Sequence, residues 1–302
     1  MSELWKLSAF AAKPAVQAAL LAHDDIEEWD PELVISGREV AEDRPQDWVL
    51  EAWYPRKPGT PQTSALKGLF PEQAPKFKSE KLAAQDWLTV SQANTKPIKA
   101  GRFHVRTPEF APDPAAINFV IPAAQAFGTG HHETTASCLE MLGILRQTGL
   151  LARAIADIGT GTGLLGFAAI ALWPRAYLTL SDIDPVCVQV VEENATLNQI
   201  ALGSGKGAAT MVIAEGLDHP LLKLRGPYDL LIANILAGPL VELANDFADN
   251  VRPGGSVVLA GLLAGEQERS VRRAYRAAGF RLVCRLQRGD WAILWLKRRQ
   301  HR

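Results

Sequence analysis

Three glycines follow an apolar segment at a spacing that suits the binding of a nucleotide-type cofactor. The segment Asp157–Gly163 reads Asp-Ile-Gly-Thr-Gly-Thr-Gly and opens a helical stretch. Glycine lets a ligand approach the backbone closely, and a helix N-terminus offers free N–H groups. The pattern therefore predicts a cofactor loop that contains Gly159 and Gly161. Residues 161–166 also match the dinucleotide pattern G-x-G-x-x-G, and a glycine turn can simply pack a strand on a helix, so the loop alone leaves the cofactor open.

A carboxylate follows the next apolar segment along the chain. The sequence Ser-Asp-Ile-Asp-Pro at residues 181–185 places Asp182 and Asp184 at the end of a predicted strand. An acid at the carboxyl end of a parallel strand meets the ribose hydroxyls of a bound nucleotide. An Asp can also cap the helix that begins after it. Ribose binding by Asp182 is compatible with capping by Asp184.

Two further polar segments are placed to contact the same ligand. Asn234 ends an otherwise apolar run at residues 229–233. Its amide either reaches the cofactor or the reacting group, or simply terminates the strand. The Gly-rich loop at residues 126–135 leads into a predicted helix at residues 136–145, and we expect this loop to fold over a ligand at the sheet edge.

Adjacent histidines in that loop raise the question of a metal site. His131 and His132 are followed by Glu133, but the residue three positions later is Ala136, so the zinc motif H-E-x-x-H is incomplete. We expect the histidines to form hydrogen bonds in the loop or the substrate channel, and we predict no metal.

Apolar strands alternate with helical segments in the second half of the chain. The predicted strands are residues 155–158, 177–181, 211–213, 229–233 and 257–260. This alternation is typical of a parallel sheet covered by helices on both faces. Residues 280–286 and 291–296, separated by Gly289-Asp290, predict an antiparallel hairpin instead of another crossover. The fold class is therefore a doubly wound α/β sheet closed by an antiparallel C-terminal hairpin.

A small α+β module precedes this sheet. Strands are expected at residues 5–10 and 47–54, and a helix at residues 14–22. The turn-rich segment Tyr54–Pro61 marks a break after the module.

The segments between the two halves read as a linker. We expect a helix at residues 79–93, capped by Ser79, and a Pro- and Gly-punctuated connector at residues 97–114. The predicted organisation is an α+β domain at residues 1–75, a helical linker at residues 76–105, and an α/β domain at residues 106–302.

Composition fits a soluble two-domain protein of 302 residues with a net charge of −1. No apolar run approaches the about 18 residues of a membrane span, and the three cysteines are too scattered for a disulfide framework, so we expect a cytoplasmic protein. The charge is uneven. Residues 1–51 carry twelve acids against four bases, and residues 269–302 carry eleven bases against one acid. Each end is either a solvated face or a surface for a partner of opposite charge.

Four segments together resemble the ribosomal protein L11 methyltransferase (PrmA) family, in order and spacing, over roughly residues 80–302. They are Phe127–Thr135, Asp157–Gly163, Asp182–Pro185 and Asn234–Pro239. The resemblance implies a seven-stranded, Rossmann-like domain that uses S-adenosylmethionine as its methyl donor. It also implies that the N-terminal domain recognises the substrate and is carried on a mobile linker. Residues 24–32 and 60–75 depart from the family pattern and look like variable loops.

The resemblance also implies which residues bind the cofactor. The family's cofactor positions fall on Thr135, Gly159, Asp182 and Asn234, and Gly161 joins them from the same glycine loop. No catalytic residue is assigned beyond positioning by Asn234. The implied reaction is methyl transfer to lysine side-chain or α-amino nitrogens of the large-subunit ribosomal protein L11, with no direct nucleic-acid substrate. The alternative is lysine methylation of another protein, such as the electron-transfer flavoprotein β subunit.

Two other enzyme classes are less consistent with these motifs. A dinucleotide-dependent oxidoreductase would not account for the loop at residues 126–135 or for Asn234. A nucleic-acid methyltransferase would fit the basic C-terminal segment, but enzymes that act on exocyclic amines usually carry Asn-Pro-Pro-aromatic after the fourth strand. Here Asn234 is followed by Ile235-Leu236.

Overall fold

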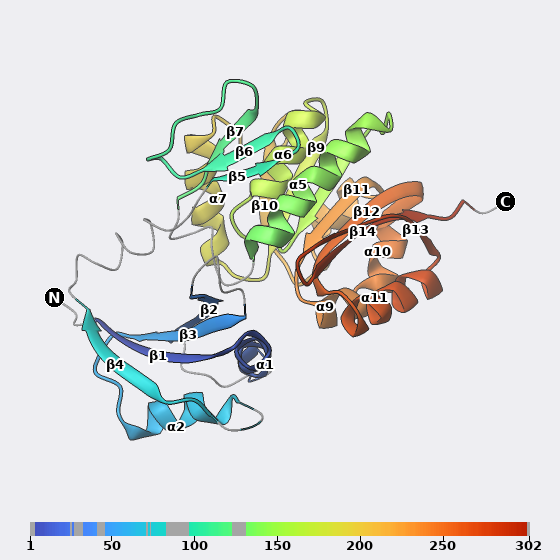
Figure 1. The fold of residues 1–302 in the computed structure, drawn as a ribbon. Helices are drawn as coiled ribbons and strands as arrows, with labels where there is room; N and C mark the ends of the chain where they lie inside the picture. The colour runs from blue at the N-terminus through green and yellow to red at the C-terminus, as the bar shows by residue number, and fades with distance from the viewer. Residues whose placement is uncertain are drawn as a thin grey trace. The chain divides into compact units, whose positions relative to one another are not determined.

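The computed structural model describes residues 4–24, 26, 33–40, 46–70, 72, 74–82, 97–122 and 131–300. The described residues before position 95 form one compact unit, and those after it form a second (Figure 1). None of the described helices is long and apolar enough to cross a membrane.

The first unit is an antiparallel four-stranded sheet with two helices. Its elements are β1 (Leu4–Ala12), α1 (Lys13–Asp24), β2 (Val34–Glu39), β3 (Asp47–Tyr54), α2 (Thr60–Gly68) and β4 (Phe77–Leu82). The strand order is β2-β3-β1-β4. Leu7 and Leu50 from the sheet, Val16 from α1 and Leu66 from α2 are buried in one core. The predicted α+β module is thus present, and its first helix and the strands at both ends of residues 5–54 match the prediction.

The helix expected from Ser79 is wrong in the part that the structure describes. Ser79 lies in β4 and pairs with Leu7 of β1, while the remaining residues of that prediction, 83–93, lie outside the described residues. The free edge of β1 offers backbone partners along its whole length, and this pairing overrides a local helix-capping signal. No described residue between positions 76 and 105 is helical.

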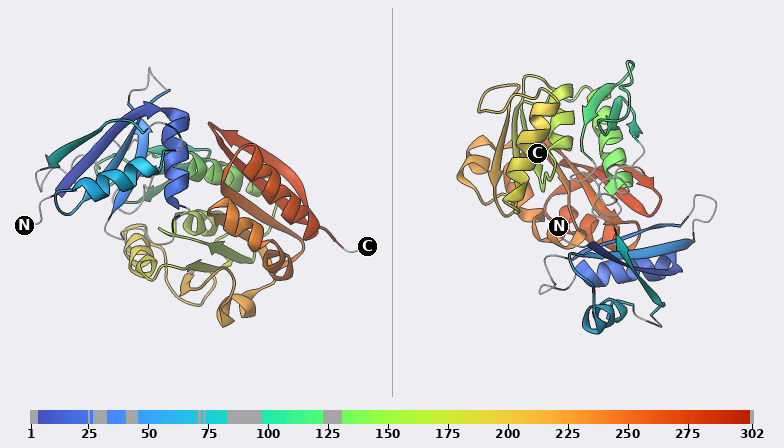
Figure 2. Two further views of the ribbon diagram at one scale, coloured as in Figure 1. Left: turned by 90° about the horizontal axis from the view of Figure 1, so that it is seen from below. Right: turned by 90° about the vertical axis from the view of Figure 1, so that its left-hand side faces the viewer.

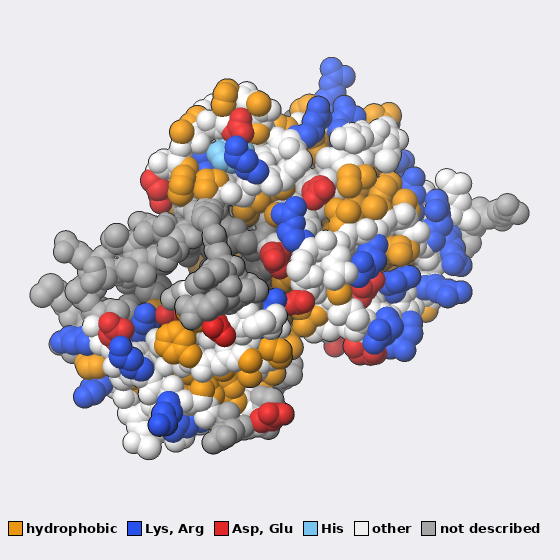
Figure 3. All heavy atoms as spheres, in the orientation of Figure 1, with side chains coloured by type: hydrophobic (Ala, Val, Ile, Leu, Met, Phe, Trp, Pro, Cys, Tyr) orange, Lys and Arg blue, Asp and Glu red, His pale blue; other side chains and the backbone are white. Residues whose placement is uncertain are grey.

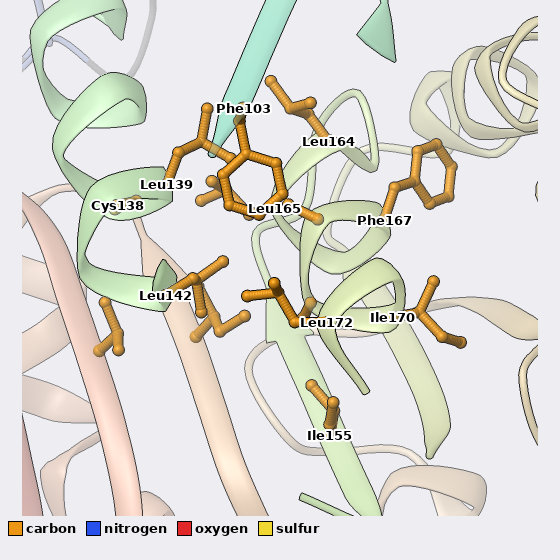
Figure 4. Close-up of a cluster of buried hydrophobic side chains, with 14 of the residues drawn as sticks. Phe103, Cys138, Leu139, Leu142, Ile155, Leu164, Leu165, Phe167, Ile170 and Leu172 are labelled. Carbon is orange, nitrogen blue, oxygen red and sulfur yellow. The ribbon is translucent and has the colours of Figure 1, made fainter. Parts of the chain in front are cut away.

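The expected connector at residues 97–114 instead contributes to a small sheet of the second unit. It consists of β5 (Ile98–Ala100), β6 (Phe103–Arg106) and β7 (Ile117–Val120), in that order. Phe103 and Phe119 stack with ring centroids 6.2 Å apart. Figure 4 shows Phe103 in one buried cluster with Leu139 and Leu165, so this sheet is part of the main core.

The second unit is built around a seven-stranded sheet with the order β10-β9-β8-β11-β12-β14-β13. The strands are β8 (Ala154–Ile158), β9 (Tyr177–Asp182), β10 (Ala209–Ile213), β11 (Tyr228–Asn234), β12 (Val251–Leu263), β13 (Phe280–Arg288) and β14 (Trp291–Arg298). The first five are parallel, whereas β14 runs antiparallel to both of its neighbours. Every predicted strand of this sheet and the predicted C-terminal hairpin are confirmed.

Helices cover both faces of this sheet (Figure 2). On one face are α5 (His131–Gln147), α6 (Leu164–Leu172) and α7 (Val186–Leu197), and on the other are α8 (Pro220–Arg225), α9 (Ala237–Glu242), α10 (Ala244–Asn250) and α11 (Glu266–Ala277). Strand β11 shows why its sequence is apolar throughout. Leu230 and Ile232 enter the core of the first face, and Leu231 and Ala233 enter that of the second.

The strand order reverses at β8, because the chain proceeds from β8 to β9 on one side and returns to β11 on the other. In open α/β sheets, ligands bind outside the carboxyl ends of the strands at such a switch point. The candidate site therefore lies where β8, β9 and β11 end.

Candidate cofactor site

Strand register brings three of the predicted site residues to one edge of the sheet. Ile158 of β8 pairs with Ser181 on one side and with Ala233 on the other. The residues that follow these three are Gly159, Asp182 and Asn234. Because side-by-side parallel strands end at the same edge, the sequence-predicted glycine, carboxylate and amide are neighbours in the structure.

The glycine loop adopts a backbone that favours glycine at each conserved turn of its path. Gly159, Gly161 and Gly163 have φ angles of +67°, +53° and +83°. This left-handed region is costly for residues with a Cβ. A hydrogen bond from the Thr160 N–H to the Ser181 carbonyl, 2.9 Å, ties the loop to β9. The loop is thus held open at the carboxyl end of β8 by its own backbone geometry.

Close packing adds a second reason for glycine at position 159. A Cβ at Gly159 would overlap Cγ2 of Ile235, the residue after Asn234, whereas a Cβ at Gly161 would meet no protein atom within 4 Å. Gly159 therefore lets the end of β11 approach the loop. Gly161 faces open space, which is where a ligand could approach the backbone.

Asp182 holds this edge of the site together. One carboxylate oxygen accepts the Gly161 N–H at 2.8 Å, and the other accepts the Asp184 N–H at 3.1 Å. Each carboxylate oxygen has two lone pairs, so both retain acceptor capacity for hydroxyl groups of a ligand. The Asp184 carboxylate accepts the Val186 N–H at 2.9 Å at the start of α7, as expected for a helix cap.

Asn234 carries an unsatisfied polar atom. Its Oδ1 is buried and has no hydrogen-bond partner among the described residues. A buried polar atom without a partner is unfavourable, so a ligand N–H or O–H group at this position would gain a hydrogen bond. Open space beside Gly161, spare acceptors on Asp182 and this amide oxygen together fit a nucleoside-containing ligand.

The structure places the remaining predicted residues less completely. Thr135 lies half-buried near the start of α5. His131 and His132 begin this helix, but residues 127–130 of the predicted loop and both histidine side chains lie outside what the structure describes. Within the described residues, no group of three or more His, Cys, Asp or Glu side chains could hold a metal.

Two residues that the sequence reasoning missed support the glycine loop from below. Asn194 of α7 is fully buried and donates from Nδ2 to the Thr162 carbonyl, 3.0 Å. Its neighbours Val191 and Ala195 are also buried, so Asn194 is a polar residue on the apolar face of a helix. That exception to the helical pattern was the signal available in the sequence.

Asp157 is the second supporting residue. Its Oδ2 accepts the Thr160 hydroxyl at 2.7 Å and the Gly166 N–H at 2.8 Å, which joins the loop to α6. Burial raises the pKa of the Asp157 carboxyl to about 7, although these two hydrogen bonds act in the opposite direction.

A nearby thiol does not add reactive chemistry to the site. Burial, with a smaller contribution from the Asp182 carboxylate, raises the pKa of Cys187 to about 12. The thiol is therefore protonated at neutral pH and is a poor nucleophile.

Comparison with known proteins gives a consistent result over most of the chain. Residues 15–299 match the family described as ribosomal protein L11 methyltransferase (PrmA). Proteins of that name from Brucella suis and Caulobacter sp. are 39% and 40% identical to the chain, over 73% and 74% of its length and 75% of theirs. The crystal structure of a ribosomal protein L11 methylase from Lactobacillus delbrueckii subsp. bulgaricus superposes with a TM-score of 0.54 at 26% identity, covering 68% of this chain and 99% of that one.

Proposed function

Because the chain belongs to the ribosomal protein L11 methyltransferase family, we propose that it transfers methyl groups from S-adenosylmethionine to ribosomal protein L11. The acceptors are lysine side-chain or α-amino nitrogens. Family membership confirms the resemblance found in the sequence motifs. The observation that carries the proposal is the convergence of Gly159, Asp182 and Asn234 at the switch point of the sheet.

Each cofactor-facing residue has a role that follows from its chemistry. The Asp182 carboxylate would accept hydrogen bonds from the ribose hydroxyls, and the open backbone at Gly161 would let the nucleoside lie close to the loop. Asn234 Oδ1 would accept a hydrogen bond from the cofactor or from the acceptor amine. We assign Thr135 to the same site on the family pattern. When bound, S-adenosylmethionine supplies a methyl group that its positive sulfur has already activated.

The protein's main contribution to this reaction is orientation. A lysine amine has an ordinary pKa of about 10.4 and an α-amino group one of about 8, and only the neutral amine is a nucleophile. Burial in the site lowers the pKa of such an amine because it disfavours the charged form. We therefore assign no general base, and Asn234 acts as a positioning residue.

Substrate recognition is assigned to the first unit. Residues 1–51 have twelve acids against four bases, which complements the basic character typical of ribosomal proteins. Phe10 of β1 is 61% exposed and lies beside Trp48, Ala11, Val40 and Asp47 at a hollow of about 340 Å³. An exposed aromatic side chain at such a hollow suits contact with a protein partner. Since ribosomal proteins are made and assembled in the cytoplasm, we place the reaction there.

Labelling in a mixture of ribosomal proteins tests this proposal. The full chain, incubated with S-adenosylmethionine labelled in its methyl group and a ribosomal lysate, should label one protein whose mass is that of L11. Label on a different protein, such as the electron-transfer flavoprotein β subunit, would overturn the substrate assignment. In a parallel calorimetric titration S-adenosylhomocysteine should bind, whereas binding of NAD instead would overturn the cofactor assignment.

A further inference from the structure

Helix α11 carries a stripe of arginines on its exposed face. Arg269, Arg272, Arg273 and Arg276 follow the spacing i, i+3, i+4, i+7, which places them on one side of a helix. The opposite side, formed by residues 268, 271 and 275, is buried against the sheet. The stripe extends over about 10 Å at the 1.5 Å rise per residue of an α-helix.

This stripe forms one wall of a groove. The other wall comes from the first residues of β13 and the last residues of β14, and the hollow between them has a volume of about 490 Å³. Its lining residues are Arg269, Arg272, Arg273, Arg276, Phe280, Arg281, Leu282, Leu296 and Arg299. We call it the arginine groove. Figure 3 shows Lys and Arg side chains gathered on the part of the second unit that carries α11 and β13.

Carboxylates of the protein neutralise only part of this charge. Glu266 contacts Arg269 at 2.6 Å and Arg273 at 3.5 Å. Glu268 contacts Arg272 at 3.3 Å, but it is held more closely by Arg285, which donates from Nε and Nη2 at 2.8 Å each.

The remaining three arginines of the groove have no such partner. In the part of the chain that the structure describes, no carboxylate lies within ion-pair distance of Arg276, Arg281 or Arg299, and all three are exposed. Six arginines therefore share two carboxylates, one of which mainly serves Arg285 outside the groove. Clustered like charges repel one another, so an anionic ligand would relieve this repulsion.

The groove does not belong to the cofactor site. Strand β13 runs in the same direction as β12, because each is antiparallel to β14. Phe280 and Arg281 begin β13 and Arg299 follows β14, so they lie at the amino edge of the parallel strands. Asp182 and Asn234 are at the carboxyl edge.

We propose that the arginine groove binds the phosphate backbone of RNA. Guanidinium groups bind phosphate oxygens through two parallel hydrogen bonds, and arginine rather than lysine supplies every cation of the groove. A stripe of about 10 Å spans roughly three phosphates of a strand that rises about 3.4 Å per nucleotide. The choice of RNA over an acidic protein rests on the proposed function, because a ribosomal protein substrate is made to associate with RNA. The RNA here is a docking partner and not a methyl acceptor.

Fluorescence anisotropy with a labelled single-stranded RNA of mixed sequence tests this inference on the full chain. The unmodified protein should bind the RNA with an affinity that falls as salt rises. The triple variant Arg276→Gln, Arg281→Gln, Arg299→Gln should bind about tenfold or more weakly, and its salt dependence should decrease by about 0.7 log units per lost contact. None of these arginines has an ion-pair partner in the described structure, so the fold should persist.

A matched variant separates the groove from net charge. Arg102, Arg146 and Arg175 are also exposed, in other parts of the second unit, and their replacement by Gln removes the same charge. This control should keep the RNA affinity within about twofold. Absence of RNA binding by the unmodified protein, or equal losses in both triple variants, would overturn the inference. So would binding of poly-glutamate as tight as that of RNA and equally sensitive to the groove variant, because this would indicate an acidic protein partner.

Methylation of isolated L11 distinguishes failure of this inference from failure of the proposed function. Both triple variants should methylate isolated L11 at the rate of the unmodified protein, since neither touches the cofactor residues. If the unmodified protein binds RNA through the groove but does not methylate L11, the proposed function fails and RNA binding by the groove stands.

Discussion

At the scale of single residues, Asp182 has both a structural and a ligand-binding role. It anchors the N–H groups of Gly161 and Asp184, and we assign its remaining lone pairs to the ribose. A hydrogen bond to a charged group contributes about 1.5–3 kcal/mol, so Asp182→Ala should weaken S-adenosylhomocysteine binding by roughly ten- to a hundredfold. Isothermal titration calorimetry measures this change. Asp184→Ala is the control, because its carboxylate caps α7 and should leave the affinity nearly unchanged. Equal affinities for Asp182→Ala and the unmodified protein would contradict the role of Asp182.

Asp157 makes a pH-dependent contribution to stability. Its pKa in the folded chain is raised from 3.8 to about 7 by burial, so the folded state retains a proton that the unfolded state releases. Stability from this group is therefore highest at acidic pH and decreases as the pH rises from about 4 to about 7. Asp157→Asn cannot titrate, so its stability relative to the unmodified protein should increase across that window and level off above it. Urea unfolding at several pH values measures the difference, and a difference that does not vary with pH would contradict the raised pKa.

At the scale of elements, the loop between β8 and α6 separates backbone strain from ligand contact. Gly161 and Gly149 both have positive φ angles, +53° and +80°, and a Cβ at either would meet no protein atom within 4 Å. Gly161→Ala and Gly149→Ala should thus each cost about 1 kcal/mol of stability through strain alone. Only Gly161→Ala should weaken cofactor binding, because only its Cβ would enter the space assigned to the ligand. Thermal unfolding and calorimetry of both variants measure the two effects, and equal cofactor affinities would show that the ligand does not approach Gly161.

The elements that the sequence predicted well are those whose environment is uniform along their length. Strand β11 is buried on both faces, so its apolar run identifies it without knowledge of its neighbours. Strand β4 reads Phe-Lys-Ser-Glu-Lys-Leu and is mostly exposed, so only its pairing with β1 decides its structure. The short strands β5, β6 and β7 lie among prolines and glycines that indicate loops, and their burial becomes evident only in the packed core.

The same distinction holds within the candidate site. The glycine loop and Asp182 follow from local motifs at the ends of strands, and their position at one edge follows from parallel pairing. Asn194 and Asp157 support the loop through hydrogen bonds to residues that only the folded chain brings near, so motif spacing does not identify them.

At the scale of the whole molecule, the proposed division of labour assigns cofactor binding and substrate recognition to different units. A fragment that begins at Pro97 retains the sheet, its two cores and each proposed cofactor residue. We expect this fragment to bind S-adenosylhomocysteine with nearly the affinity of the full chain but not to methylate L11. Calorimetry and a methylation assay measure the two activities. Methylation of L11 by the fragment at the rate of the full chain would show that the first unit is not required for recognition.

The mass of purified L11 after incubation with the full chain and S-adenosylmethionine tests the central claim most directly. Intact-protein mass spectrometry should show L11 heavier by whole numbers of methyl groups, and Asp182→Ala should slow this increase when the cofactor is below saturation. An unchanged mass of L11, under conditions in which calorimetry shows that the chain binds S-adenosylmethionine, would contradict the claim that this site methylates L11.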